Sequence, residues 1–345
     1  MVPVEDSEWN EVGTPGYAAG GGRARVPIAY LGGIAARSER YMRDHWSAAK
    51  GFTTPAGLLD SAQKEEEDHA ALQTEAGLDL LAPALTRWED LLRPLLRDGS
   101  GATAGQLTRY FETNTFFRQP AVEGGPLSPP SPATWFEGFR LPAGKPWVLT
   151  LPSPYDFAVR AKDAREGSTV AALSAEAGNA LRPVVQAAVT QGAGLVRFHD
   201  PSIAYARSPP RDVDAFAEGL ALAAKGHERI ATLHVTNGDP FSVTDALLAN
   251  PLGGLSIEDP GRAVPASLRL PGDTRLSVAV IRGEDSLVED PEEASKAALS
   301  LADRLGLGLF GVTNGWDLDH VPHAIATRKV RALGQTRRIL AEVLA

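Results

Sequence analysis

Apolar stretches of strand length alternate with helix-length stretches along most of this chain, and this alternation constrains the fold more than any other feature. Strands that are separated by helices pair in parallel, because the crossover brings the chain back to the same edge. The expected strands span residues 26–31, 77–81, 147–151, 195–199, 229–235, 254–258, 276–281 and 307–312. The expected helices include 59–76, 170–190, 212–225, 242–248, 291–305 and 322–345. Eight such strands predict an α/β fold of the (β/α)₈ TIM-barrel type.

Two segments depart from the alternation. Residues 1–24 are rich in glycine and are predicted to form a flexible N-terminal arm ahead of a single barrel over 25–345. Within 107–146, a β-prone aromatic stretch runs into Pro129-Pro130-Ser131-Pro132, which is expected to be irregular. We therefore predict a hairpin and loop inserted after the second strand and lying over the barrel mouth.

Composition excludes several classes of protein. The net charge of −9 over 345 residues argues against a general nucleic-acid binder, which needs basic patches. No apolar run reaches the length of a membrane span, and the acidic N-terminus does not resemble a secretory signal, so a cytoplasmic location is expected. The chain has no cysteine, which removes disulfides, thiolate nucleophiles and zinc–thiolate sites.

Polar residues follow the later strands, and the carboxyl ends of barrel strands meet at the mouth where barrel enzymes do their chemistry. The predicted catalytic residues are His199, Asp200, His234 and Glu258. Adjacent side chains on a strand point to opposite faces, so at most one of His199 and Asp200 faces the barrel axis. His234 also fits a structural role, because a lone histidine is more often a satisfied core residue than a ligand.

The predicted substrate-binding residues come from the insertion and from the ends of later strands. They are Asn114, Arg118, Asn237, Asn314, Asp317 and His320. His320 and His323 have a spacing that suits metal chelation on a helix, but they fit equally well as a loop anchor and a first-turn residue.

Several segments resemble the cobalamin-independent methionine synthase family, over roughly residues 25–345. Leu255-Ser256-Ile257-Glu258 is similar to the Ser-Ile-Glu strand of the family's catalytic barrel. The other similar segments are 72–79, Arg109-Tyr110-Phe111-Glu112-Thr113-Asn114, Leu151-Pro152-Ser153-Pro154 and Val196-Arg197-Phe198-His199-Asp200-Pro201. Their order and spacing along a barrel carry the resemblance.

The resemblance implies methyl transfer from a methyl-folate to homocysteine, whose thiolate the family binds on zinc through His, Cys, Glu and Cys. His234 and Glu258 match the first and third ligands, whereas Thr236 and a residue near Trp316 occupy the cysteine positions. Zinc is therefore implied by the family, with His234 and Glu258 as its only matching ligands. Without zinc, a protonated His199, His234 or His320 is the predicted partner of the thiolate.

The segments 109–114 and 317–322 resemble the family's other, zinc-free barrel. The resemblance thus implies an atypical methyltransferase, using methyl-folate or methyl-cobalamin, or a partner of a zinc-bearing barrel. Two alternatives remain open: a non-catalytic binding barrel, and a metal-dependent lyase or hydrolase that uses His199, Asp200, His234 and Glu258.

Overall fold

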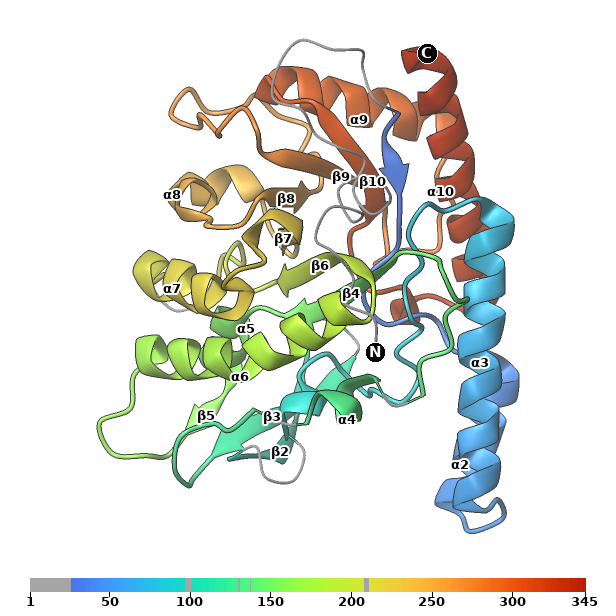
Figure 1. The fold of residues 1–345 in the computed structure, drawn as a ribbon, viewed down its shortest axis with the longest axis vertical. Coiled ribbons are helices and arrows are strands. Elements are labelled where there is room, and N and C mark those ends of the chain that lie inside the picture. The colour runs from blue at the N-terminus through green and yellow to red at the C-terminus, as the bar shows by residue number, and fades with distance from the viewer. Residues whose placement is uncertain (1–25, 97–100, 114, 130, 137, 208–210) are drawn as a thin grey trace, which may run out of the picture.

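The computed structural model describes residues 26–96, 101–113, 115–129, 131–136, 138–207 and 211–345. Its centre is a seven-stranded parallel sheet, which Figure 1 shows as a curled fan. In spatial order the strands are β1 (Ile28–Ala29), β10 (Leu309–Asn314), β9 (Arg275–Ile281), β8 (Gly254–Ile257), β7 (Ala231–Val235), β6 (Ala193–Asp200) and β4 (Trp147–Pro152). These strands confirm seven of the eight predicted, and their residues are almost all buried. The predicted flexible arm, 1–24, lies outside the described residues.

The second predicted strand, 77–81, does not form a strand in the described structure. Leu80 and Leu81 make only isolated parallel bridges, to Tyr30 and to Trp147. Just beyond them, the side-chain amide of Gln73 takes both backbone groups of Ala82, with two hydrogen bonds of 2.8 Å. The Gln73 side chain therefore pairs the backbone groups that a longer strand would have bonded to a neighbouring strand. The structure shows a parallel seven-stranded sheet in place of the predicted eight-stranded barrel.

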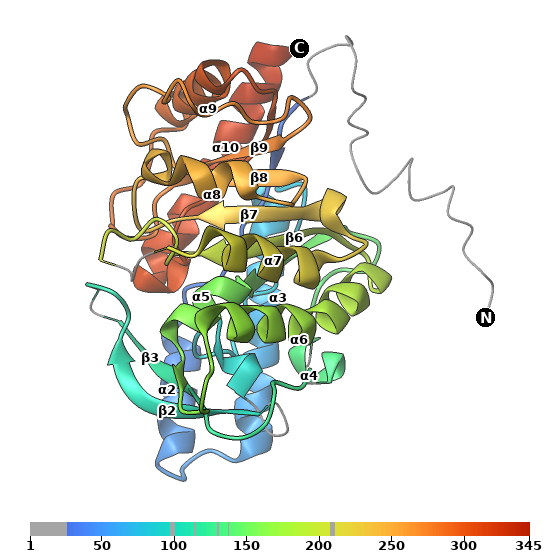
Figure 2. The ribbon, with the colours of Figure 1, turned by 90° about the vertical axis from the view of Figure 1, so that its left-hand side faces the viewer.

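Helices cover the outside of the sheet, and their ends follow local capping signals. Thr169 caps α6 (Val170–Thr190), Asp212 caps α7 (Val213–Ala224) and Asp290 caps α9 (Pro291–Leu305). The other predicted helices are α3 (Pro55–Ala76), α8 (Thr244–Ala249) and α10 (His323–Leu344). Figure 2 shows α5 to α8 on one side of the sheet, and Figure 1 shows α3 and α10 on the other. No helix in the described ranges is long and apolar enough to cross a membrane.

Some elements were not predicted. The helix α2 (Glu39–Ala49) packs against α3, and α5 (Pro154–Arg160) follows β4 directly. Ser153 caps α5 and Pro154 occupies its first position, where the missing N–H costs nothing. Short 3₁₀ turns complete the list: η1 (Arg93–Leu96), η2 (Glu228–Ile230), η3 (Pro240–Val243) and η4 (Leu318–His320).

The interruption between the second and third predicted strands contains a hairpin, as the aromatic pattern indicated. Its strands, β2 (Ala102–Arg109) and β3 (Phe116–Val122), are antiparallel, and β5 (Lys162–Asp163) adds to β3 in parallel. The hairpin begins at Ala102, five residues before the predicted start of the insertion. The proline-rich stretch is not wholly irregular, because Pro132 begins the short helix α4 (Pro132–Phe136).

Candidate functional site

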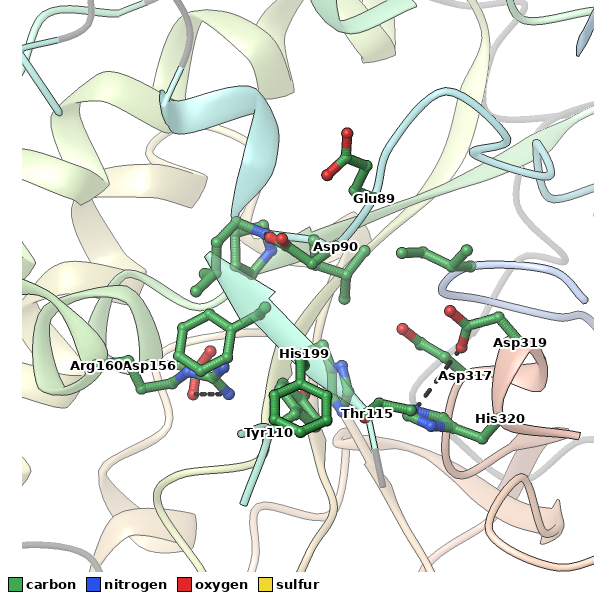
Figure 3. A pocket seen from close by; sticks show the side chains of 16 residues that line it. Glu89, Asp90, Tyr110, Thr115, Asp156, Arg160, His199, Asp317, Asp319 and His320 are labelled. Carbon is green, nitrogen blue, oxygen red and sulfur yellow. Dashed lines mark hydrogen bonds and ion pairs between the residues drawn. The ribbon is translucent and has the colours of Figure 1, made fainter. Parts of the chain in front are cut away.

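A pocket lies where the carboxyl ends of β4, β6 and β10 meet the hairpin, and we call it the mouth pocket. Residues from the strand ends, from the hairpin and from the loop before η1 line it together. Its polar and charged lining residues are Glu89, Asp90, Tyr110, Thr115, Asp156, Arg160, His199, Asp317, Asp319 and His320. In Figure 3, Arg160 and Asp156 lie on one side of His199 and Tyr110, and Asp317, Asp319 and His320 lie on the other.

His199 is the penultimate residue of β6, the strand beside the edge strand β4, and is the predicted catalytic residue that lines this pocket. Its Nε2 shares a hydrogen bond of 2.7 Å with Thr236 Oγ1 on the neighbouring strand end. Burial, followed by the nearby positive charge of Arg197, lowers the pKa of His199 well below its usual value. The ring is therefore neutral at neutral pH, which contradicts the prediction that a protonated His199 pairs with a thiolate.

One side of the mouth pocket is acidic. Burial, with a further contribution from the neighbouring carboxyl of Asp319, raises the pKa of Asp317 to about 8. One oxygen of each carboxyl, Oδ1, has no hydrogen-bond partner in the described part of the chain. Asp317 packs against Gly33, whose positive φ of 83° and lack of a Cβ make that approach possible. His320 lies 3.7 Å from Asp319, so two predicted residues, Asp317 and His320, do line the pocket.

The opposite side is basic and aromatic. Arg160 ends α5, four residues after Asp156, and the nearest atoms of that pair are 3.9 Å apart. The guanidinium carbon of Arg160 lies 3.9 Å from the ring centre of Phe117, 4.3 Å from that of Tyr110 and 4.9 Å from that of Phe111. All three rings belong to the hairpin or its turn, so cation–π contacts hold the hairpin against α5.

His234, Ser256, Glu258 and Gly315 form a second group, which we call the inner cluster, and no member lines the mouth pocket. His234 is fully buried; its Nδ1 bonds Ser256 Oγ at 2.8 Å and its Nε2 bonds the Gly315 carbonyl at 2.7 Å. Burial lowers the pKa of His234 well below its usual value, so a protonated His234 is also contradicted.

Glu258 lies directly after β8, and its carboxyl packs against Gly315, where an added Cβ would overlap Oε1. Oε1 has no hydrogen-bond partner among the described residues. Burial, with a further contribution from Glu284, raises the pKa of Glu258 to about 7. The rings of His199 and His234 are 5.2 Å apart, so the inner cluster adjoins the mouth pocket without opening into it.

Arg197 ties the strand ends together from inside the sheet. Its Nη2 donates to the carbonyls of Asn314 at 2.9 Å and of Gly315 at 3.0 Å. The amide of Asn314 in turn exchanges two hydrogen bonds with the backbone of Gly32, at 2.8 and 2.9 Å. Burial lowers the pKa of Arg197 to about 10. Asn314, a predicted substrate residue, thus joins β10 to the segment that follows β1, and its side-chain amide is engaged in hydrogen bonds to the backbone.

The remaining predicted residues that the structure describes do not line the mouth pocket. Asp200 accepts hydrogen bonds from Ser153 Oγ and from two backbone N–H groups of the next turn, consistent with its opposite orientation to His199. Asn237 adopts a positive φ of 59° and donates to the Pro201 carbonyl. Arg118 is exposed on β3, and its Nη1 donates to the carbonyl of Gly105 on the paired strand β2. Asn114 lies outside the described residues.

The donor set does not fit the zinc that the resemblance implies. Both nitrogens of His234 are engaged, Thr236 bonds His199, and Trp316 offers no donor that zinc accepts. In the described ranges, no group of three His, Asp or Glu side chains is arranged to hold a metal ion. His320 is the last residue of the 3₁₀ turn η4 and His323 is the first residue of α10, so the two do not lie on one helix at the predicted spacing.

Sequence reasoning assigned no role to Arg160, Asp156, Tyr110 or Asp319. Tyr110 and Asp319 sit inside segments that the family resemblance covered, but nothing in their spacing marked them. Asp156 and Arg160 had a usable signal: a carboxylate and a guanidinium at i and i+4, directly after a buried strand end.

No known protein family and no curated protein sequence matches the chain. Several solved structures share its fold. A B12-independent methionine synthase from Shewanella sp. W3-18-1, in complex with selenomethionine, is 14% identical with a TM-score of 0.72, covering 92% of this chain and 98% of that one. A putative vitamin-B12-independent methionine synthase from Listeria monocytogenes is 15% identical, with a TM-score of 0.72 and coverage of 92% and 99%.

A methyltransferase from Methanosarcina mazei is 15% identical, with a TM-score of 0.56 and coverage of 92% and 94%. At these identities the likeness shows the fold, and it covers nearly the whole length of each of the three structures.

Proposed function

We propose that the protein is a methyltransferase that moves a methyl group onto the sulfur of homocysteine or a similar thiol amino acid. The mouth pocket is the proposed acceptor site. The observation that carries the proposal is a neutral, buried imidazole, His199, lining a charged pocket at the strand ends of a fold shared with methionine synthases. Fold alone does not imply function, so the argument depends on the pocket.

The proposed chemistry needs a base. The acceptor thiol loses its proton, the sulfur bonds the methyl carbon, and the bond from that carbon to the donor breaks, with its electron pair staying on the donor. A free alkyl thiol is mostly protonated at neutral pH, so a positioned base raises the rate. Nε2 of His199 is bonded to Thr236, while Nδ1 has no hydrogen-bond partner in the described part of the chain. We assign Nδ1 as the proton acceptor.

The test measures methionine formed from homocysteine, with methyl-tetrahydrofolate or methyl-cobalamin as donor. The protein is assayed alone and mixed with a zinc-bearing methionine synthase. Transfer by the protein alone, lost in His199→Gln, supports the proposal. Transfer only in the mixture, unaffected by His199→Gln, overturns it in favour of an accessory barrel, the alternative that the missing zinc donors favour.

A further inference from the structure

Arg160 is a buried charge whose hydrogen bonds are missing. The residue is only 9% exposed, and none of its three side-chain nitrogens has a hydrogen-bond partner among the described residues. A buried guanidinium left this way is costly, because its N–H groups have lost water without a replacement. The cage of Phe117, Tyr110 and Phe111 offers ring faces to the cation, and its one polar group, the Tyr110 hydroxyl, makes no hydrogen bond to the guanidinium.

The nearest carboxylate, that of Asp156, does not supply the missing hydrogen bonds of Arg160. Asp156 is 3.9 Å from Arg160, beyond hydrogen-bond distance, and it accepts a hydrogen bond of 2.5 Å from Ser202 Oγ instead. Arg160 therefore presents a planar set of donors to the mouth pocket that it lines.

A ligand carboxylate has the matching geometry, since its two oxygens accept two parallel N–H donors of a guanidinium. The opposite side of the mouth pocket carries Asp317 and Asp319, whose Oδ1 atoms accept no hydrogen bond from the described residues, although Asp319 Oδ1 lies 3.7 Å from His320 Nε2. Figure 3 shows the two charged sides facing each other across His199 and Tyr110. A molecule with a carboxylate at one place and an ammonium at another would complement both.

We propose that the mouth pocket binds an α-amino acid, with its carboxylate on Arg160 and its ammonium group on Asp317 and Asp319. This inference rests on the proposed function, because only that function specifies a sulfur-containing side chain for the ligand. It assigns to this chain a positive carboxylate subsite built from α5 and the hairpin.

The experiment uses calorimetric titration of the full chain with four small molecules. L-methionine and its sulfur-free isostere L-norleucine carry both charges, methylthiopropylamine lacks the carboxylate, and methylthiobutanoate lacks the ammonium group. In the wild type, methylthiopropylamine should bind roughly 30-fold or more weakly than L-methionine, because it leaves the buried guanidinium unpaired.

Arg160→Met should remove that difference, and Arg160→Lys, which keeps the charge without the planar donors, should reduce it. Asp317→Asn should weaken L-methionine while leaving methylthiobutanoate unchanged. The matched control is Arg165→Lys: Arg165 follows the same helix but is paired with Asp163 and Glu176, outside the mouth pocket. This variant should keep the wild-type ratio.

The inference is overturned if the wild type binds none of the four molecules, or binds methylthiopropylamine as tightly as L-methionine. It is also overturned if folded Arg160→Met or Arg160→Lys keeps the wild-type ratio. A different result would show that the proposed function is wrong while the inference holds: L-methionine and L-norleucine would bind through Arg160, but no methyl transfer would be detected. Conversely, transfer that persists unchanged in Arg160→Met keeps the function and removes the carboxylate subsite.

Discussion

The mouth pocket and the inner cluster lie side by side at the strand ends, but their buried polar groups differ in how fully they are hydrogen-bonded within the protein. In the inner cluster, both nitrogens of His234 are bonded within the protein, to Ser256 and to the Gly315 carbonyl. In the mouth pocket, Arg160, Asp317 and Asp319 keep polar atoms without a partner in the described structure. Buried polar groups are normally satisfied, so unsatisfied ones indicate where a ligand completes the structure. The comparison separates His234, whose hydrogen bonds hold the fold, from Arg160, Asp317 and Asp319 in the mouth pocket; Glu258, whose Oε1 has no hydrogen-bond partner among the described residues, is the exception in the inner cluster.

The largest expected effect concerns the base. His199→Gln should lower kcat/KM for methyl transfer by roughly 10²–10⁴-fold, the usual contribution of general base catalysis, with little change in stability. Steady-state methionine formation measures it. His45→Gln, on the exposed part of α2, is the matched control and should have no effect. Equal rates for the two variants would show that His199 is not the base. The mouth pocket would then have no catalytic group to distinguish it from the inner cluster.

The second prediction concerns His234. His234→Ala should lower the free energy of unfolding by about 2–4 kcal/mol, because it leaves a cavity and an unpaired Gly315 carbonyl. The loss of kcat/KM should be far smaller than for His199→Gln. Urea unfolding measures the first effect and steady-state kinetics the second. A His234→Ala protein of unchanged stability but no activity would move the reaction into the inner cluster.

The third prediction uses the raised pKa of Glu258. The folded protein holds this proton up to a pKa of about 7, whereas the unfolded chain releases it near 4.5. The folded state therefore binds more protons between these values, and its stability is full below the unfolded pKa and falls as pH rises through the folded one. The loss from this group is about 1–3 kcal/mol in order of magnitude.

Urea unfolding at pH 5 and pH 8 tests it. Glu258→Gln should flatten the dependence without removing it, because Asp200 and Asp317 also have raised pKa values, of about 7 and about 8. Glu67→Gln, on the exposed face of α3, should leave the dependence as in the wild type. If Glu258→Gln and Glu67→Gln behave alike, Glu258 is ionised in the folded protein at neutral pH, and water reaches its carboxyl group.

The smallest expected effect is that of a chelator. The inner cluster lacks the thiolate ligands that hold zinc tightly, so dialysis against EDTA should leave the melting temperature unchanged. Metal analysis of protein purified without a histidine tag should find far less than one zinc per chain. One zinc per chain that survives the dialysis would show that His234 and Glu258 rearrange to bind metal.

Some features followed from the sequence because their causes are local. Strand and helix periodicity predicted seven of the strands and helices such as 291–305, whose Asp290-Pro291 start and Gly306 end are capping signals. Parallel strand ends share one edge, so the expectation of a barrel was enough to place His199 and Asp317 at one mouth, although β7, β8 and β9 lie between their strands. The opposite orientations of His199 and Asp200 followed from strand geometry alone.

Tertiary structure decided which of those polar residues face the pocket. His199 and His234 occupy paired positions on neighbouring strands, yet the Gly315 carbonyl and Ser256 happen to close around His234 alone. Arg160 acquires its environment from a hairpin some forty residues earlier in the chain, whose rings cage it. The state of the buried carboxyls also depends on desolvation by distant segments. Sequence spacing records none of these contacts, because each joins residues that are far apart along the chain.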